Sequence, residues 1–380
     1  MNSQAMRERI LVIDVLRGLV MLLMLVDHVR EYFFLHRQVS DPMDLASTAT
    51  GLFFTRLTSH FCAPTFIFLT GLGAYLYQQR YETSKLQTSR YLLTRGVLFV
   101  LLEISVVNFA WSFDLRPTIL YLQVIWAIGL CMIALAALCW LPRLLQIGFA
   151  LFIICGHNLF DSVHYSPHEF GYWIWHILHD RAVLPLSETL AVRTSYPVLP
   201  WIGVILLGYT FGALYRADIS SQLRQKYLCI WGIATLCMFA LVRFLNGYGD
   251  LPRIIDASIL VQLMSWVNLT KYPPSFLYLT FTLGLLFLLL SYFESRQGPK
   301  FLSVYGRVPL FFYISHLYVL HLMYVVCVSV YGLNQGSRYG FDHIYQIWLF
   351  AILLAIFFYP VCHWFARFKK QSQSKWAPYL

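Results

Sequence analysis

Charged residues are scarce in this chain. Only 12% of its 380 residues are Asp, Glu, Lys or Arg, whereas soluble domains carry about 25%. Hydrophobic residues make up 59% of the sequence, and the mean hydropathy is +0.62. This balance excludes an ordinary soluble domain and predicts a polytopic membrane protein.

Closely spaced cysteines are also absent. The eight cysteines stand in apolar stretches, and no two form a CxxC pair, which disfavours a metal site or a disulfide framework. The histidines of "DSVHYSPHEFGYWIWHILHD" have spacings that fit no compact metal site either. We therefore expect no bound metal.

Acidic residues are outnumbered by basic ones, 18 to 28, which gives a net charge of +10. The basic residues lie in short loops between apolar runs, so they indicate membrane topology rather than a nucleic-acid partner. The sequence has no visible soluble domain, low-complexity tract or internal repeat. The lack of a repeat disfavours many transporter folds.

Ten apolar runs approach the length of about 20 residues that a helix needs to cross a bilayer. They predict an all-α fold with about ten transmembrane helices in a single domain, 1–380. Asp14 and Arg17 interrupt the first run, which argues against a cleavable signal peptide and for a retained span. The runs are 10–29, 56–78, 92–111, 119–141, 144–160, 198–215, 227–246, 275–293, 308–331 and 344–366.

Alternate loops between these runs are basic. Together with both ends of the chain they hold 18 of the 28 Lys and Arg residues. The positive-inside rule therefore predicts that both termini are cytoplasmic. The opposite side carries three longer loops, 30–55, 161–197 and 247–274, and long loops of this kind are often functional.

The first run, "LRGLVMLLMLVDHVRE", contains charges that lipid penalises. Arg17 and His28 are eleven residues apart, which is three helical turns plus about 20°, so they share one face about 16 Å apart along the axis. Such a face should meet protein or water rather than lipid. Asp14 is one turn from Arg17 and is a candidate ion-pair partner. The alternative is that Arg17 extends to the cytoplasmic surface as a topology anchor.

The second run adds a further histidine, His60, one turn from Arg56. If the first two helices are antiparallel neighbours, His60 and His28 lie at similar depth near the outer face. Asp27 and Asp44 are available to orient an imidazole, and an oriented histidine is a credible general base.

Three further histidines stand in or next to the apolar runs. His36, in the loop after the first run, is a second candidate base. His316 and His321 are five residues apart and do not share a helix face well, which disfavours haem ligation.

Several segments resemble the family named for the catalytic domain of heparan-α-glucosaminide N-acetyltransferase. They are "RILVIDVLRGLVMLLMLVDHVREYF", "DPMDLASTATGLFFTRLTSHFCAPTFIFLTG", "YPVLPWIGVILLGYTFG", "KYPPSFLYLT" and "YGRVPLFFYISHLYVLH", and residues 9–75 are the most specific part. The D-x-x-RG opening, with a histidine eleven residues beyond its Arg, is also similar to acyltransferase type 3 proteins.

The resemblance implies a membrane enzyme that moves an acetyl or other acyl group from cytoplasmic acyl-CoA to a hydroxyl or amine, usually of a sugar, on the far side. By position, His28 corresponds to the catalytic base of the type 3 motif, and Arg17 lies along the acyl-CoA path. The lysosomal enzyme differs, with Asn in place of His28 and a histidine in the following loop, for which His36 is the nearest match here.

Other charged residues could stabilise the oxyanion of such a reaction or contact the acyl-CoA. Arg30, Arg56 or His60 could stabilise the oxyanion of the reaction, with Asp27 beside the base. Asp14 and Arg17 would flank the acyl-CoA arm. Direct transfer and a transient acyl-enzyme both fit. A basic cytoplasmic entrance for the phosphates could be formed by Arg7, Arg9, Arg90, Arg95 or Arg307.

Two alternatives stay open at this stage. A transporter or carrier of a small solute or lipid-linked sugar also needs polar residues inside its spans, and a structural membrane protein would have no chemistry at all. The expected partners are acyl-CoA, a saccharide or other small acceptor and the lipid bilayer. A bacterial inner membrane is the expected location, and the acceptor and oligomeric state are not fixed by the sequence.

Overall fold

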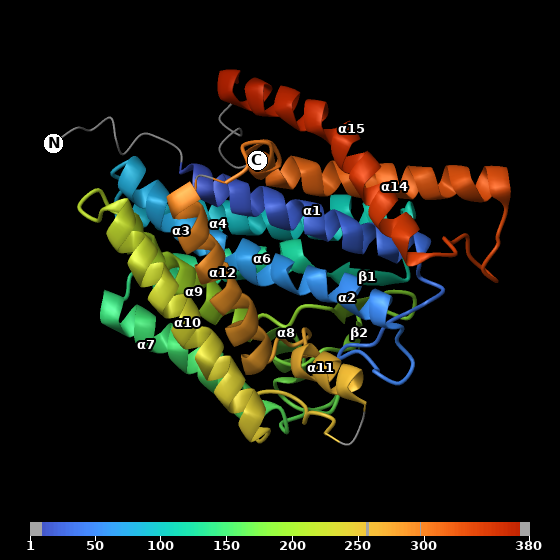
Figure 1. Ribbon diagram of the computed structural model, residues 1–380, viewed down its shortest axis with the longest axis horizontal. Helices are drawn as coiled ribbons and strands as arrows, with labels where there is room; N and C mark the ends of the chain where they lie inside the picture. The colour runs from blue at the N-terminus through green and yellow to red at the C-terminus, as the bar shows by residue number, and fades with distance from the viewer. Residues whose placement is uncertain (1–9, 256–257, 297, 373–380) are drawn as a thin grey trace.

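The computed structural model describes residues 10–255, 258–296 and 298–372, and within them the chain is largely helical (Figure 1). The longer helices are α1 (Leu11–Phe33), α3 (Cys62–Arg80), α4 (Lys85–Leu102), α10 (Ser221–Leu245), α12 (Phe276–Arg296), α14 (Pro309–Tyr331) and α15 (Ile344–Gln371). The shorter ones are α2 (Thr50–Thr58), α5 (Asn108–Ser112), α6 (Val124–Leu138), α7 (Arg143–Gly156), α8 (Tyr172–Leu178), α9 (Leu199–Phe211), α11 (Ile259–Val267) and α13 (Leu302–Gly306).

The prediction of a helical, membrane-spanning fold is confirmed. In the described part of the chain, seven helical segments are long and apolar enough to cross a membrane. They are Thr50–Arg80, Lys85–Ser112, Arg143–Phe160, Ser221–Leu245, Phe276–Arg296, Pro309–Tyr331 and Ile344–Gln371. The other three predicted runs contain α1, α6 and α9, so each run holds a helix. The count of ten spans and the cytoplasmic termini stay predictions.

One predicted run begins differently. Residues 119–122 form the strand β1 (Ile119–Leu122) rather than the first turn of a helix. It pairs in parallel with β3 (Ala191–Thr194), which is antiparallel to β2 (Val183–Pro185). Asn108 extends the pairing, because its side chain both accepts from the Tyr121 backbone N–H at 2.8 Å and donates to the Tyr121 carbonyl at 3.0 Å.

The sheet, α8 and α11 form a cap over one end of the helices (Figure 1). Helix α8 and the strands β2 and β3 of this cap come from the predicted outer loop 161–197, and α11 comes from the predicted outer loop 247–274. Arg243, at the end of α10, connects this helix to α11. It donates to the carbonyl oxygens of Trp266 and Ser265, at 3.2 and 2.5 Å. The first predicted outer loop is shorter than expected, because α1 continues to Phe33 and α2 begins at Thr50.

Helix α1 lies between α14 and α3 (Figure 1), and most of its residues are buried. Its apolar residues Val15, Leu16, Val20 and Leu25 are fully buried. Asp14, Asp27 and Arg30 of the same helix are buried as well, with 2, 6 and 3% of their surface exposed. The charged residues of α1 are therefore placed inside the protein and not against lipid.

The first half of α1 packs on α13 at backbone contact. A Cβ atom added to Gly18 would lie 1.8 Å from the Leu302 carbonyl oxygen, and one added to Gly306 would lie 1.8 Å from the Asp14 carbonyl oxygen. Only glycine permits this approach. The contact fixes the position of α1 along its axis, and with it the depth of every side chain that α1 carries.

We predict that Gly18→Ala destabilises the protein. The added methyl group must separate α1 from α13, and overpacking of this kind costs about 1–3 kcal/mol. Thermal unfolding of the purified protein in detergent measures the change. Gly148→Ala is the matched control, because a Cβ atom at this helical glycine meets nothing within 4 Å. Equal transition temperatures for the two variants would contradict the close contact.

Candidate functional site

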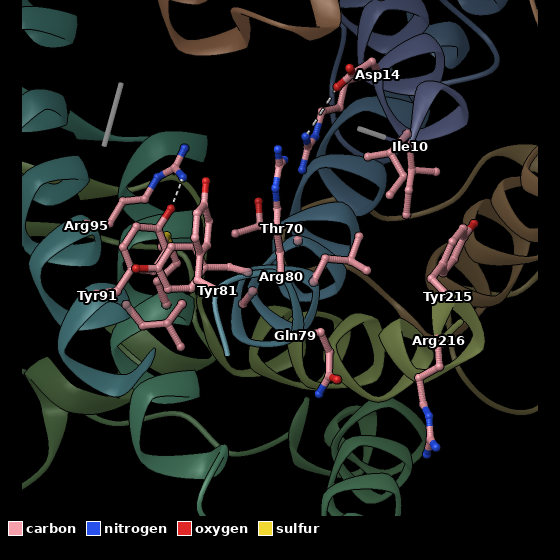
Figure 2. Close-up of a pocket in the computed structure, with 18 of the residues that line it drawn as sticks. Ile10, Asp14, Thr70, Gln79, Arg80, Tyr81, Tyr91, Arg95, Tyr215 and Arg216 are labelled. Atoms are coloured by element: carbon pink, nitrogen blue, oxygen red, sulfur yellow. Dashed lines mark hydrogen bonds and ion pairs between the residues drawn. The ribbon is translucent and has the colours of Figure 1, made fainter. Parts of the chain in front are cut away.

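A cavity of about 750 Å³ opens beside the first turns of α1. Its walls come from α1, α3, α4, α6 and the segment that joins α9 to α10. Figure 2 shows Arg95 and Tyr91 on one wall and Ile10 and Asp14 on another. We call it the basic cavity, because its lining includes Arg17, Arg80, Arg95, Arg216 and Arg224.

Arg17 lies in the wall of the basic cavity at the contact between α1 and α3. It donates to the Leu69 carbonyl at 3.1 Å and is 3.9 Å from the Asp14 carboxylate. A Cβ atom at Gly73 would lie 3.2 Å from its guanidinium, so the glycine leaves room for it. The predicted proximity of Asp14 and Arg17 is confirmed, and Arg17 contacts α3 rather than extending away as a surface anchor.

The other four arginines differ in how their charge is balanced. Arg224 pairs with Glu294 at 2.8 Å, and Arg216 pairs with Asp218 at 3.1 Å. Among the described residues, neither Arg80 nor Arg95 has a carboxylate within 4.0 Å. Two unneutralised cations in a concave wall favour binding of an anion.

Arg95 has unused hydrogen-bonding capacity as well. One of its terminal nitrogens donates to the Tyr91 hydroxyl at 2.7 Å, and its guanidinium lies over the Phe99 ring at 5.2 Å. Its buried Nε has no hydrogen-bond partner within the described structure. A buried donor without a partner is costly, and a bound anion would satisfy it.

A buried charge cluster, Asp27, Arg30, Glu31 and Arg56, lies toward the other end of α1. The Asp27 carboxylate accepts from Arg30 Nε at 2.9 Å and from Arg56 Nη1 at 2.6 Å. Arg30 also contacts Glu31 at 3.3 Å, and Arg56 donates to the Ser59 hydroxyl at 2.7 Å. Charges removed from water need partners of this kind, so the cluster explains how α1 tolerates ionised side chains.

His28 lies next to the charge cluster but does not bond to it. Its Nδ1 is 2.7 Å from Nε2 of His316 on α14, and the planes of the two rings are nearly parallel, with an interplanar angle of 10°. Nδ1 of His316 is 2.6 Å from the Phe312 carbonyl oxygen. The Trp111 ring meets the His28 ring edge to face at 5.2 Å. Both rings are thus held by packing as well as by hydrogen bonds.

A second, small cavity of about 40 Å³ adjoins His28. A cavity of this size holds a few water molecules. Its polar lining includes Asp27, Glu31, Ser59, Gln123 and Lys271, besides the aromatic pair Tyr196 and Tyr272, whose hydroxyls are 2.9 Å apart. We call it the His28 cavity.

The two cavities lie in line along the contact between α1 and α3. On α3, Phe66 lines the His28 cavity and Thr70 lines the basic cavity, which is about 6 Å along the helix. On α1, Met24 lines the His28 cavity and Arg17 lines the basic cavity, and the two residues are about 10 Å apart along the helix. The predicted common face of Arg17 and His28 is confirmed, and it faces cavities rather than lipid.

The expected carboxylate partners of the histidine are not where we predicted them. Asp27 gives both oxygens to arginines, and Asp44 lies in an exposed turn, where the Ser47 hydroxyl holds the pKa of its carboxyl below the ordinary value. In the described structure neither carboxylate is hydrogen-bonded to the His28 ring, and His316 makes that contact instead.

The other candidate bases lie apart from the His28 cavity. His60 packs edge to face on Tyr278 at 5.3 Å, and its buried Nδ1 has no hydrogen-bond partner among the described residues. His36 lies beside Phe34 and Gly340, and burial lowers the pKa of its imidazole. Neither lines either cavity.

The predicted basic entrance is only partly where we expected it. Arg95 lines the basic cavity, but Arg90 and Arg307 are exposed and do not. Arg7 and Arg9 fall outside the described residues. Sequence reasoning counted Arg80, Arg216 and Arg224 as topology signals and did not recognise them as part of one cavity wall, because three separate segments bring them together.

Sequence reasoning also missed Lys271, which stands in the segment "KYPPS" before α12. Lys271 is almost fully buried. Its Nζ is 3.5 Å from the Ser59 hydroxyl and lies over the Tyr272 ring, 5.2 Å from the ring centroid. It has no carboxylate within 4.0 Å in the part of the chain that the structure describes. A lysine after an apolar run reads as a loop residue, so only the fold reveals its burial.

The histidines of the cap take part in local pairs. His164 and Asp180 are 3.0 Å apart, and His179 and Asp161 are 3.1 Å apart. Across residues 10–255, 258–296 and 298–372, no group of three or more His, Cys, Asp or Glu side chains is placed to hold a metal ion. Both pairs lie within the cap.

We predict that Arg56→Met destabilises the protein by about 3–5 kcal/mol, because it leaves the buried Asp27 with one cation instead of two. Combining it with Asp27→Asn should recover part of the loss, which thermal unfolding of both variants would measure. Arg216→Met, which breaks an exposed ion pair, is the control and should leave the transition unchanged. Strictly additive effects of the Asp27 and Arg56 substitutions would contradict their coupling.

Comparison with known proteins agrees with the geometry. A family model described as "Heparan-alpha-glucosaminide N-acetyltransferase, catalytic" matches residues 9–244, while no curated protein matches the chain. The matched range contains α1 to α9, nearly all of α10, and most of the walls of both cavities. Together with the long apolar helices, the match indicates an integral membrane acetyltransferase and suggests acetyl-CoA as the acyl donor. The chain belongs to the heparan-alpha-glucosaminide N-acetyltransferase catalytic-domain family.

Proposed function

We propose that this protein transfers the acetyl group of acetyl-CoA to an amine or hydroxyl of a saccharide, with His28 as the general base. One observation carries the proposal: the basic cavity and the His28 cavity are aligned along the same face of α1. A long donor with an anionic head and a reactive end needs this arrangement, and a carrier of neutral solutes does not.

The basic cavity suits the nucleotide part of acetyl-CoA. Its volume of about 750 Å³ lies within the range of about 300–1,000 Å³ that is usual for ligand pockets. Arg80 and Arg95 can bind phosphate oxygens, since neither has a carboxylate partner among the residues that the structure describes. Tyr77, Tyr81 and Tyr91 line the same space and offer ring faces to the adenine.

The acyl arm then follows α1. From Arg17 the arm passes Met24 and Phe66, the residues of α1 and α3 that line the His28 cavity nearest to the basic cavity. The His28 cavity is too small for an acetyl group together with an acceptor, so these side chains must move aside when the substrates bind. Methionine adapts its shape easily, which suits Met24 to this position.

The chemistry requires a proton acceptor beside the thioester. As the acceptor nitrogen or oxygen attacks the thioester carbonyl carbon, His28 takes its proton and a tetrahedral oxyanion forms. The carbon–sulfur bond then breaks, the oxyanion returns to a carbonyl, and His28 gives the proton to the departing CoA sulfur. Direct transfer needs no other proton donor or acceptor.

Lys271 is the best-placed group to stabilise the oxyanion. Arg30 and Arg56, which the sequence suggested for this role, are already paired with Asp27. Lys271 lines the His28 cavity, is buried, and has no acidic partner among the residues described. A desolvated cation without a counter-ion interacts strongly with charge that develops beside it.

The acceptor is expected to enter from the cap. Tyr196, Tyr272 and Gln123 line the His28 cavity on that side, and aromatic rings combined with amide and hydroxyl groups suit a sugar. With the termini cytoplasmic, the basic cavity opens to the cytoplasm and the acceptor lies on the far side of a bacterial inner membrane.

We predict that Arg95→Met weakens acetyl-CoA binding by about 10- to 100-fold, because one charged hydrogen bond to phosphate is lost. Titration calorimetry on the detergent-purified protein measures the affinity. Arg90→Met is the matched control on the same helix, because Arg90 is exposed and lies outside the cavity lining. Equal losses in the two variants would indicate general electrostatic attraction, not a phosphate site.

We predict that His28→Gln reduces acetyl transfer by about 10²-fold or more while acetyl-CoA still binds, because only the proton acceptor is removed. Release of CoA, with glucosamine as the acceptor, gives the rate. His36→Gln is the control and should remain active, since His36 lines neither cavity. Full activity of His28→Gln combined with an inactive His36→Gln would transfer the role of base to His36.

A further inference from the structure

We infer that His316 is a positioning residue that fixes the tautomer of His28, so that the unprotonated Nε2 of His28 is the nitrogen available to a substrate. The inference rests on the proposed function for its catalytic meaning. The tautomer itself follows from hydrogen-bond geometry that links α1 to α14, beyond the residues that the family model matches.

The argument begins at the Phe312 carbonyl. His316 Nδ1 lies 2.6 Å from this oxygen, and a carbonyl oxygen can only accept a hydrogen bond. Nδ1 of His316 must therefore carry a hydrogen. A neutral imidazole has one N–H, so Nε2 of His316 has a lone pair and acts as an acceptor.

The second step concerns His28. Its Nδ1 lies 2.7 Å from His316 Nε2, a distance that requires one hydrogen between the two nitrogens. Because His316 Nε2 accepts, His28 Nδ1 donates. His28 Nε2 is then left with its lone pair, which is what a general base needs. The opposite arrangement would place the hydrogen on His28 Nε2 and block proton uptake.

Packing keeps His316 in this orientation. The ring is fully buried, lies 5.0 Å from the Phe312 ring and meets Tyr313 edge to face at 5.8 Å. A ring flip would turn Cδ2 toward the Phe312 carbonyl and Cε1 toward His28, and so break both hydrogen bonds. The hydrogen-bonded chain from the Phe312 carbonyl through His316 to His28 is consequently a fixed element of the fold.

Within the described part of the chain, no carboxylate holds the tautomer of His28. Asp27 is adjacent to His28 in the chain, yet both of its oxygens are engaged by Arg30 and Arg56. In serine proteases a buried carboxylate holds the catalytic histidine in the correct tautomer. Here a neutral histidine backed by a backbone carbonyl does so. When His28 takes up a proton at Nε2, its Nδ1–H remains donated to His316, which shares the charge.

The tautomer can be measured without any activity. Nitrogen NMR of protein labelled with ¹⁵N-histidine distinguishes protonated from unprotonated ring nitrogens, and the His28 signals are those lost in His28→Gln. We expect a protonated Nδ1 and an unprotonated Nε2 in the wild type. His316→Leu should shift His28 toward the other tautomer, whereas His316→Gln, whose amide oxygen can still accept, should preserve it. A protonated Nε2 in the wild type, or no change in His316→Leu, would overturn the inference.

Kinetics test the consequence. With acetyl-CoA and glucosamine, His316→Leu should lower kcat by about 10²-fold with an unchanged KM for acetyl-CoA, and His316→Gln should stay within about tenfold of the wild type. His321→Leu is the matched control on α14, because His321 bonds the Ala110 carbonyl and not His28. Normal kcat in His316→Leu would contradict a positioning role. A wild type that never turns over would contradict the proposed function and leave the NMR result standing.

Discussion

Charge buried on α1 is the constraint on which the rest of the structure depends. Asp27 bridges Arg30 and Arg56, and no membrane helix could hold these groups against lipid. Helix α1 must therefore be enclosed by other helices, and the backbone contact of Gly18 with α13 fixes how deeply it lies. The polar face of α1 then lines cavities, and its position in the bundle decides what those cavities can hold.

The two ends of α1 face cavities of different chemical character. One end of α1 meets a wide cavity with unneutralised arginines, and the other meets a narrow cavity with His28, Lys271 and a pair of tyrosines. In the proposed function, charge recognition and proton transfer are thereby separated by about 16 Å of one helix. Only a donor that is anionic at one end and reactive at the other can use both cavities together. The charge cluster beside His28 serves structure, which leaves the base to be oriented by a neutral partner.

Local pattern predicted much of this from the sequence. Apolar run length located the helices, and the helical repeat placed Arg17 and His28 on one face. The strand at 119–122 was missed because an apolar run of this kind does not distinguish a strand from a helix, and its partner lies about 70 residues away. The contact of His28 with His316 spans 288 residues, so no local pattern could indicate it. The burial of Lys271 could not be predicted for the same reason, because the residues that cover it are distant in the sequence.

The most direct measurement of the central claim is an electron cryo-microscopy structure of the protein with acetyl-CoA in lipid nanodiscs. The account predicts the phosphates against Arg80 and Arg95, the pantetheine arm along α1 past Arg17, and the thioester beside His28 Nε2. A nucleotide bound on the cap side, or an arm that leaves the contact between α1 and α3, would contradict it.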